Sequence, residues 1–190
     1  MLLLLLPACT TLYSDSELYQ QQSAREQALN GVNDWLIRGK IAFLQTDGKQ
    51  SANLYWWRQA QRQELKLTTF LGVNVLTLTT QSGLHTLEID GKTYQHRDLD
   101  YLLASISGID LPVSALTMWL KGMKYTHTDD IQYSDTTELP TRLTSHLNNR
   151  HYQVDYQGYT LVNQFRLANK LTIHHDNMRI KLAINTWELF

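Results

Sequence analysis

Seven histidines and a few neighbouring carboxylates are the side chains that could support metal binding or acid–base catalysis. His174-His175 is the only adjacent histidine pair. Because adjacent residues of a strand point to opposite faces, this pair cannot bind one metal ion without a bend, and we interpret it as a solvated strand end. Asp129-Asp130 and the pair Asp98 and Asp100 could supply paired carboxylates, but Asp is also the usual residue at helix starts and turns. We therefore interpret these carboxylates as structural.

Motifs for catalysis and for nucleic-acid binding are missing from the sequence. It contains no G-x-S-x-G elbow, Walker A loop, H-E-x-x-H helix or G-x-G-x-x-G turn. The five tryptophans could form a platform for sugars or bases, but Lys plus Arg number 17 against 18 Asp plus Glu, and no basic stripe accompanies them. We predict a protein that is not an enzyme and has no metal, cofactor or nucleic acid, although a hydrolase that uses Asp130 and His151 stays open as an alternative.

Cys9 is the only cysteine, which excludes an internal disulfide and a cysteine-based zinc site. It follows an apolar run in the segment Leu6-Pro7-Ala8-Cys9, which has the form of the lipobox that precedes a lipidated cysteine. We predict a signal-peptide remnant over 1–8 and a tether over 9–13, with a covalent acyl or diacylglyceryl group on Cys9. The apolar run is short and lacks positive charge, so we expect the true start to lie upstream. The alternative is a disordered apolar terminus with a chance cysteine.

Residues 14–190 have the composition of one globular domain, with 43% hydrophobic and 18% charged residues in the chain. Ser14 and Glu17 have the spacing of a capping box and predict a surface helix that Gly31 ends. From Trp35 onward the apolar period changes to 2, which indicates strands separated by turns such as Asp47-Gly48. No later stretch approaches the length of a transmembrane helix.

Eight to eleven short strands are expected, interrupted by two helices over 99–108 and 113–122. An open sheet of that size would leave aggregation-prone edges, which favours a curved antiparallel half-barrel covered or plugged by the helices. Such a sheet encloses more room than its own side chains need, so we predict an apolar cavity that binds an apolar chain. The candidate lining residues are Trp35, Ile37, Phe43, Leu54, Trp56, Leu65, Leu67, Leu76, Leu78, Leu102, Ile106, Leu116, Trp119, Leu120, Tyr152, Val154, Ile180 and Leu182.

An apolar loop is expected where a polar turn would be usual. Phe70, Leu71 and Gly72 interrupt two strands, and a hydrophobic tip in water is unfavourable unless it meets a membrane or a partner. We predict that these three residues form a membrane-insertion loop. The alternative is a wider loop that folds back onto the core.

Several segments together resemble a known family over nearly the whole chain. They are Leu6-Pro7-Ala8-Cys9, the run from Trp35 to Ala42, Trp56-Trp57-Arg58-Gln59, Leu111-Pro112 with Leu116, Trp119-Leu120-Lys121-Gly122, Tyr152-Gln153-Val154-Asp155-Tyr156 and Ile180-Lys181-Leu182 running to Trp187. In their order and spacing the chain resembles the LolB family, the outer-membrane lipoprotein receptors of the lipoprotein-sorting (Lol) pathway of Gram-negative bacteria.

The resemblance implies a half-open antiparallel barrel with a helical lid over an apolar cavity. It implies a monomer, lipid-anchored on the periplasmic face of the outer membrane, that accepts lipoproteins from the soluble carrier LolA by their acyl chains and releases them into the membrane without nucleotide. The leucine that assists insertion in this family falls on Leu71, where Phe70 replaces the usual proline. Thr10, after the cysteine, is consistent with the outer membrane. The runner-up hypothesis is a soluble or membrane-tethered periplasmic carrier of the same fold.

Overall fold

The computed structural model describes residues 15–46, 48–108 and 111–190, and side chains from Gln22 onward. The predicted signal remnant, the tether and Cys9 lie outside these residues. The described part contains three helices: α1 (Asp15–Asn30), α2 (Leu99–Ser107) and α3 (Val113–Trp119). Its eleven strands are β1 (Trp35–Gln45), β2 (Gly48–Gln59), β3 (Arg62–Thr68), β4 (Asn74–Gln81), β5 (Leu84–Ile89), β6 (Lys92–His96), β7 (Asp130–Tyr133), β8 (Pro140–Leu147), β9 (Arg150–Val162), β10 (Phe165–His175) and β11 (Met178–Leu189).

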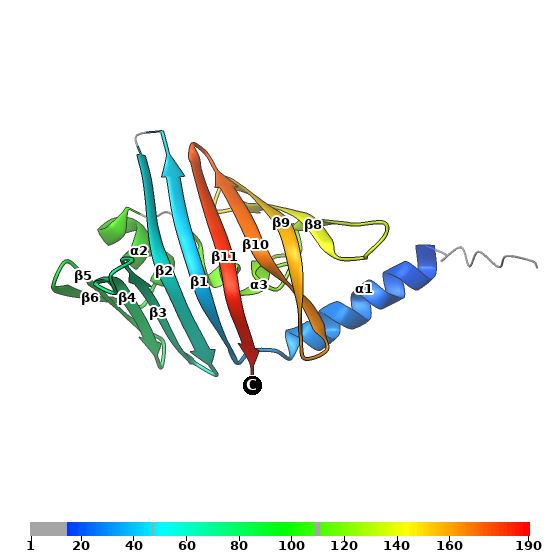
Figure 1. Cartoon of the computed structure of the whole chain (residues 1–190), viewed down its shortest axis with the longest axis horizontal. Helices are drawn as coiled ribbons and strands as arrows, with labels where there is room; N and C mark the ends of the chain where they lie inside the picture. The colour runs from blue at the N-terminus through cyan, green and yellow to red at the C-terminus, as the bar shows by residue number, and fades with distance from the viewer. Residues whose placement is uncertain (1–14, 47, 109–110) are drawn as a thin grey trace, which may run out of the picture.

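All eleven strands form one antiparallel sheet in the order β6-β5-β4-β3-β2-β1-β11-β10-β9-β8-β7. Strands that follow each other in the sequence are neighbours, except β6 and β7, which lie at opposite edges of the sheet. The first strand β1 also pairs with the last strand β11. The sheet is curved and open, with β6 and β7 at its edges, and α2 and α3 lie behind it in the view of Figure 1. The predicted half-open antiparallel architecture is confirmed.

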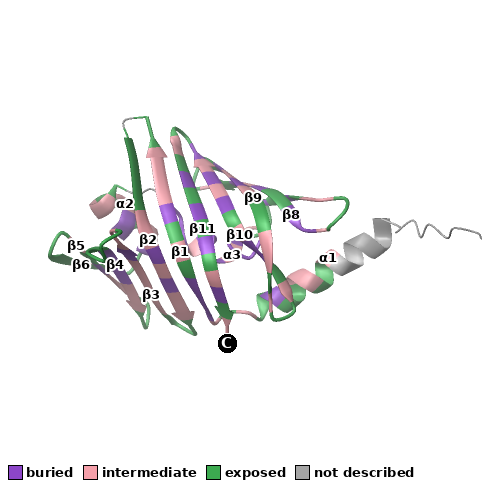
Figure 2. Ribbon diagram, in the orientation of Figure 1, coloured by how far each residue is buried: buried purple, intermediate pink, exposed green. Residues whose placement is uncertain are grey.

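Burial alternates along the strands, as the period of 2 predicts. In β11 the buried residues Ile180, Leu182 and Ile184 alternate with exposed ones, which gives the banded strands of Figure 2. The buried face packs against α2 and α3 and forms the core. Trp35 lies at the centre, with its ring 5.1 Å from that of Trp56 and 5.9 Å from that of Trp187.

A bulge in β1 lets β1 and β11 pair along their length. The pairing register shifts between Arg38 and Gly39, and a Cβ atom at Gly39 would lie 2.1 Å from the carbonyl oxygen of Ala183. Only glycine allows the two backbones to approach this closely. The glycine that interrupts the alternation in the sequence is therefore the residue that allows this pairing.

Helices α2 and α3 begin where the sequence signals predict, but α3 ends at Trp119, before the predicted end at Gly122. Asp98 caps α2 by accepting a hydrogen bond from the Tyr101 amide, and Gly108 ends α2 with φ at 67°. Pro112 precedes α3. Helix α1 ends at Asn30, just before Gly31, and runs outward beside the sheet (Figure 1). None of the helices in the described ranges is long and apolar enough to span a bilayer.

Candidate functional site

An apolar cavity lies between the sheet and the helices α2 and α3. Its walls come from β1, β2, β3, β4 and β11 on one side and from α2, α3 and the segment before α3 on the other. Every lining side chain is apolar, with only the Trp56 indole containing a polar atom. The lining residues are Ile41, Phe43, Leu54, Trp56, Leu65, Leu67, Leu76, Leu78, Leu103, Leu111, Val113, Leu116 and Leu182.

The structure brings half of the predicted cavity residues together around this cavity. Those that line it are Phe43, Leu54, Trp56, Leu65, Leu67, Leu76, Leu78, Leu116 and Leu182. The others pack in the surrounding core or against it: Trp35, Ile37, Leu102, Ile106, Trp119, Leu120, Tyr152, Val154 and Ile180. The predicted lining omitted Ile41, Leu103, Leu111 and Val113, although all but Leu111 stand in segments whose periodicity predicted a strand or helix.

The cavity is almost filled by its own side chains in this structure. Its volume is about 40 Å³, and a cavity needs roughly 10–15 Å³ to hold one water molecule, so an acyl chain does not fit. The expectation of a roomy interior is therefore wrong for this conformation, because the leucines of α2 and α3 fill the concave face of the sheet. Any apolar chain that binds here must displace part of the helical layer.

Helix α3 is attached to the rest of the protein through Trp119, at its C-terminal end. The indole Nε1 of Trp119 donates to Asp129 at 3.2 Å, and the Tyr156 hydroxyl donates to the Trp119 carbonyl at 2.8 Å. The Asp100 carboxylate of α2 accepts hydrogen bonds from the backbone of α3, among them one from the Val113 amide at 3.0 Å. Burial raises the pKa of Asp100, although hydrogen bonds from the backbone of Ser114 and Val113 oppose this.

Asp129 joins three segments through five hydrogen bonds. It accepts from Trp119 on α3, from Ser145 on β8, and from the backbone amides of Tyr125 and Thr126 and the hydroxyl of Thr126. Burial of the carboxylate raises its pKa, but these hydrogen bonds to the charged form outweigh burial and lower the pKa of Asp129 below its ordinary value. The predicted structural role of Asp129 agrees with this geometry, whereas Asp130 begins strand β7 instead of a helix or loop.

Lys121, just after α3, is a buried cation. Its Nζ donates to the carbonyl oxygens of Leu29 at 3.2 Å and Val32 at 2.9 Å, and it is only 3% exposed. Burial, and secondarily the charge of Arg58, lowers the pKa of Lys121 to about 8. Lys121 therefore links the end of α1 to the segment that follows α3.

The loop between β3 and β4 projects an apolar tip into solvent. Phe70 is 87% and Leu71 86% exposed, while Thr69 closes the loop by accepting hydrogen bonds from the amides of Gly72 and Val73. Gly72 has φ at 84°, which favours glycine. The structure thus orients the predicted membrane-insertion loop outward, and the alternative of a loop folded onto the core is wrong.

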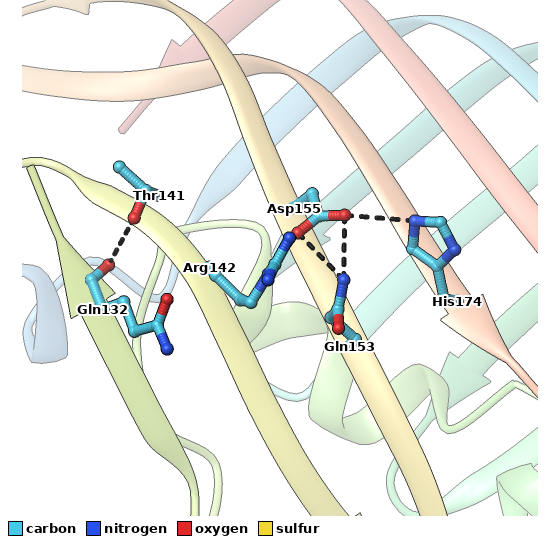
Figure 3. A network of polar contacts seen from close by, with 6 residues as sticks. All are labelled: Gln132, Thr141, Arg142, Gln153, Asp155 and His174. Carbon is cyan, nitrogen blue, oxygen red and sulfur yellow. Dashed lines mark hydrogen bonds and ion pairs between the residues drawn. The ribbon is translucent and has the colours of Figure 1, made fainter.

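A polar network on the sheet contains a carboxylate and an imidazole, but it is occupied by structural partners. Asp155 on β9 accepts from Arg142 at 2.7 Å, from Gln153 at 3.0 Å and 3.1 Å, and lies 3.1 Å from Nε2 of His174 (Figure 3). These contacts link β8, β9 and β10. With its oxygens so engaged, Asp155 is arranged as a cross-strand link and not as a catalytic base.

The remaining candidates for chemistry are also separated or packed. Asp130 and His151 lie on β7 and β9, with β8 between them, which gives the hydrolase alternative no assembled site. His175 is 5% exposed and stacks on Tyr152, with ring centroids 4.4 Å apart, so the interpretation of a solvated strand end is wrong for this residue. In the described ranges, no group of three or more His, Cys, Asp or Glu side chains could hold a metal ion.

The curved open sheet with helices on its concave face defines the class of protein. The structure of this chain is similar to that of a LolA superfamily protein from Nitrosomonas europaea. The TM-score is 0.58 and the sequence identity 6%, over 90% of this chain and 93% of that chain. The fold is thus shared with the LolA superfamily.

The particular family follows from sequence comparison. The family model described as outer membrane lipoprotein LolB matches residues 33–187. The outer-membrane lipoprotein LolB of Shewanella woodyi is 36% identical over 97% of this chain and 84% of its own length. That of Shewanella frigidimarina is 34% identical over 80% of this chain and 75% of its own length. The chain belongs to the LolB family of outer-membrane lipoproteins.

Proposed function

We propose that this protein accepts lipoproteins from a soluble periplasmic carrier of the LolA kind and inserts them into the outer membrane. It binds their acyl chains in the apolar cavity and uses no nucleotide. Cys9 bears the lipid that anchors the protein, residues 9–13 form the tether, and residues 14–190 form the domain that binds the cargo. The protein acts as a monomer.

The observation that supports this proposal most directly is the chemistry of the cavity wall. All thirteen lining residues are hydrophobic, and they come from both the sheet and the helices. A site without hydrogen-bonding partners other than one indole selects hydrocarbon over polar ligands, because each polar group buried without a partner is unfavourable. Acyl chains are the hydrocarbon that a lipoprotein offers.

Transfer without nucleotide is consistent with the energetics of hydrocarbon burial. Moving a CH₂ group from water into an apolar site is favourable by about 0.8 kcal/mol of free energy, but moving it from one apolar site to another changes the free energy far less. A small difference in affinity between the carrier, this protein and the membrane therefore directs the cargo.

The first experiment changes the space available at Leu103, which lines the cavity from α2. The Leu103→Phe substitution fills the cavity and should weaken binding of a fluorescent diacylated lipopeptide several-fold, whereas Leu103→Ala enlarges it and should preserve or strengthen binding. Circular dichroism checks that both variants are folded. Equal binding by both folded variants and the unsubstituted protein would exclude this cavity as the acyl site.

The second experiment tests the apolar loop. In a transfer assay from a loaded carrier to outer-membrane vesicles, Leu71→Glu should retain lipopeptide binding but deliver at least tenfold less cargo, because a carboxylate disfavours insertion into a membrane. The matched control is Leu161→Glu, which places the same charge on a leucine of β9 that is 69% exposed. Normal delivery by Leu71→Glu, or an equal loss in the control, would contradict a role for the loop.

The second candidate function is a periplasmic carrier, free or tethered, and the fold shared with the LolA superfamily favours it. Cys9 discriminates between the two functions. Mass spectrometry of the native protein should find a diacylated or triacylated N-terminal Cys9, and Cys9→Ser should move the protein to the soluble fraction. An unmodified native protein would favour the free carrier.

A further inference from the structure

Two histidines face each other on the solvent side of the sheet, near the tip of the β8–β9 hairpin. His146 on β8 is the direct register partner of His151 on β9. Their ring centroids are 4.9 Å apart, with an angle of 62° between the ring planes. Both side chains are exposed, whereas the adjacent residues Ser145 and Tyr152 are buried on the other face of the sheet. The pair therefore lies in solvent, apart from the apolar cavity.

The turn of the hairpin determines how close the two rings lie. Asn148 and Asn149 form a two-residue loop and have φ at 53° and 61°, and a type I′ turn requires positive φ at both positions. Such a turn is closed by a hydrogen-bonded pair, here Leu147 and Arg150, so the next pair along the strands is a non-hydrogen-bonded one. In a pair of that kind the Cα atoms are only about 4.5 Å apart and the side chains are closest. The two histidines occupy this position.

The ring nitrogens of both histidines are accessible to a ligand. Within the described part of the chain, neither imidazole has a hydrogen bond or an ion pair, and the contact of His151 with His175 is made by the His151 backbone carbonyl. The nearby cation Arg150 forms a side-chain hydrogen bond with Tyr152, which is buried on the opposite face. Its charge is thus directed away from the imidazoles.

The spacing of the rings is that of two imidazoles bound to one metal ion. A zinc ion lies about 2.0–2.1 Å from an imidazole nitrogen. With an angle of about 90–110° at the metal, the centres of two such rings lie about 4.5–5.2 Å apart. The 4.9 Å between the centroids of His146 and His151 is within this range. Rotation of two exposed side chains, without movement of the backbone, therefore directs one nitrogen of each ring to a shared point.

We propose that His146 and His151 bind a divalent transition-metal ion as a bidentate pair. Imidazole ligands suit Cu²⁺, Zn²⁺ and Ni²⁺, whereas Mg²⁺ and Ca²⁺ prefer oxygen ligands. No third His, Cys, Asp or Glu among the described residues completes the set, so water fills the remaining coordination positions. This site departs from the sequence-based expectation of a protein without a metal, because only the hairpin brings the two histidines together.

The test is calorimetric titration of the full chain with Cu²⁺, Zn²⁺ and Mg²⁺ in the Cys9→Ser background, which removes the only thiol. Cu²⁺ should bind more tightly than Zn²⁺, and Mg²⁺ should not bind measurably. His146→Gln and His151→Gln should each weaken Cu²⁺ and Zn²⁺ binding at least tenfold, because either change removes the advantage of a second ligand held in place. His127→Gln, which changes an exposed histidine outside the pair, is the matched control and should bind both ions as the Cys9→Ser protein does.

A second measurement uses the fact that the ion joins two strands of the folded protein. Zn²⁺ should raise the melting temperature of the Cys9→Ser protein and of the His127→Gln control, but not that of His146→Gln or His151→Gln. The proposal is overturned if neither Cu²⁺ nor Zn²⁺ binds, if Mg²⁺ binds as tightly as Zn²⁺, or if His127→Gln weakens binding as much as His146→Gln. It is also overturned if the losses of the two single substitutions add in the double variant, which would indicate two independent contacts. None of these outcomes bears on lipopeptide binding, which separates this test from that of the proposed function.

Discussion

At the scale of single residues, Asp129 shows how a buried charge can position a helix. Its carboxylate holds the Trp119 indole, the turn at Tyr125 and Thr126, and the Ser145 hydroxyl. A buried carboxylate is stabilising only when such partners satisfy it. The position of α3, and with it one wall of the apolar cavity, therefore depends on a side chain that does not line the cavity.

The Asp129→Asn substitution should destabilise the protein by about 2–3 kcal/mol, because an amide cannot accept all of these hydrogen bonds and places its own donors against other donors. Urea unfolding measures this loss. The neighbouring Asp130→Asn is the control, since Asp130 is exposed, and it should change stability little. Equal effects of the two substitutions would contradict the structural role of Asp129.

Burial of the Lys121 amine makes the stability of the folded protein depend on pH. Its pKa is about 8 in the folded protein and near 10.5 when unfolded, so between these values the unfolded chain binds more protons. Stability attributable to Lys121 therefore rises with pH across that interval, by at most about 1.4 kcal/mol per pH unit. Below pH 8 the penalty of burying the charged amine is present in full.

Urea unfolding of the unsubstituted protein and of Lys121→Met at pH 7 and pH 9.5 tests this sign. The difference in the free energy of unfolding should shift in favour of the unsubstituted protein at the higher pH. A difference that stays constant would show that Lys121 keeps its ordinary pKa.

At the scale of the elements, Gly39 allows the first strand, β1, to pair with the last strand, β11. Gly39→Ala should cost about 2 kcal/mol or more, because its Cβ would overlap the Ala183 carbonyl. Gly48→Ala is the matched control, since a Cβ there meets no atom within 4 Å. Thermal melting should separate the two variants clearly, and similar melting temperatures would mean that β1 and β11 adjust to a side chain at this site.

Most elements could be predicted because one face of each is buried. The alternation in β1, β2 and β11 and the glycine that ends α2 are local signals, so the sequence alone contains them. The number of strands could be predicted only as eight to eleven, since the edge strands carry little pattern: β6 has no fully buried residue and β7 has one, Ile131.

The site was predicted less completely than the fold, for a physical reason. Periodicity indicates that Leu102 and Leu103 are both buried, but only the seating of α2 on the sheet decides that Leu103 lines the cavity and Leu102 does not. The same holds for Leu111 and Val113, which flank Pro112 and reach the cavity through the path of the chain before α3. Long-range packing of this kind leaves no local signal.

At the scale of the whole molecule, the two helices over the cavity differ in how firmly they are held. Helix α3 is tied to β9 through the Tyr156–Trp119 hydrogen bond and to β8 through Asp129, while α2 is held by hydrogen bonds from the backbone of α3 to Asp100 and by its packing. We therefore expect α2 to move when an acyl chain enters. Hydrogen exchange should accelerate over Leu99–Ser107 on binding a diacylated lipopeptide and stay unchanged around Trp119. Uniform protection of α2 in the bound state would contradict this order of movement.

Because side chains fill the interior, the protein must open before an acyl chain can bind, and this lowers its apparent affinity for the chain. If the ligand-free protein is open for about one part in a hundred of the time, its apparent affinity is about a hundredfold weaker than that of the open form. The leucines that fill the interior compete with a bound acyl chain for the same space, and because they belong to the protein their effective concentration does not change. If the protein binds acyl chains as proposed, this competition favours release of the cargo and fits the proposed transfer without nucleotide.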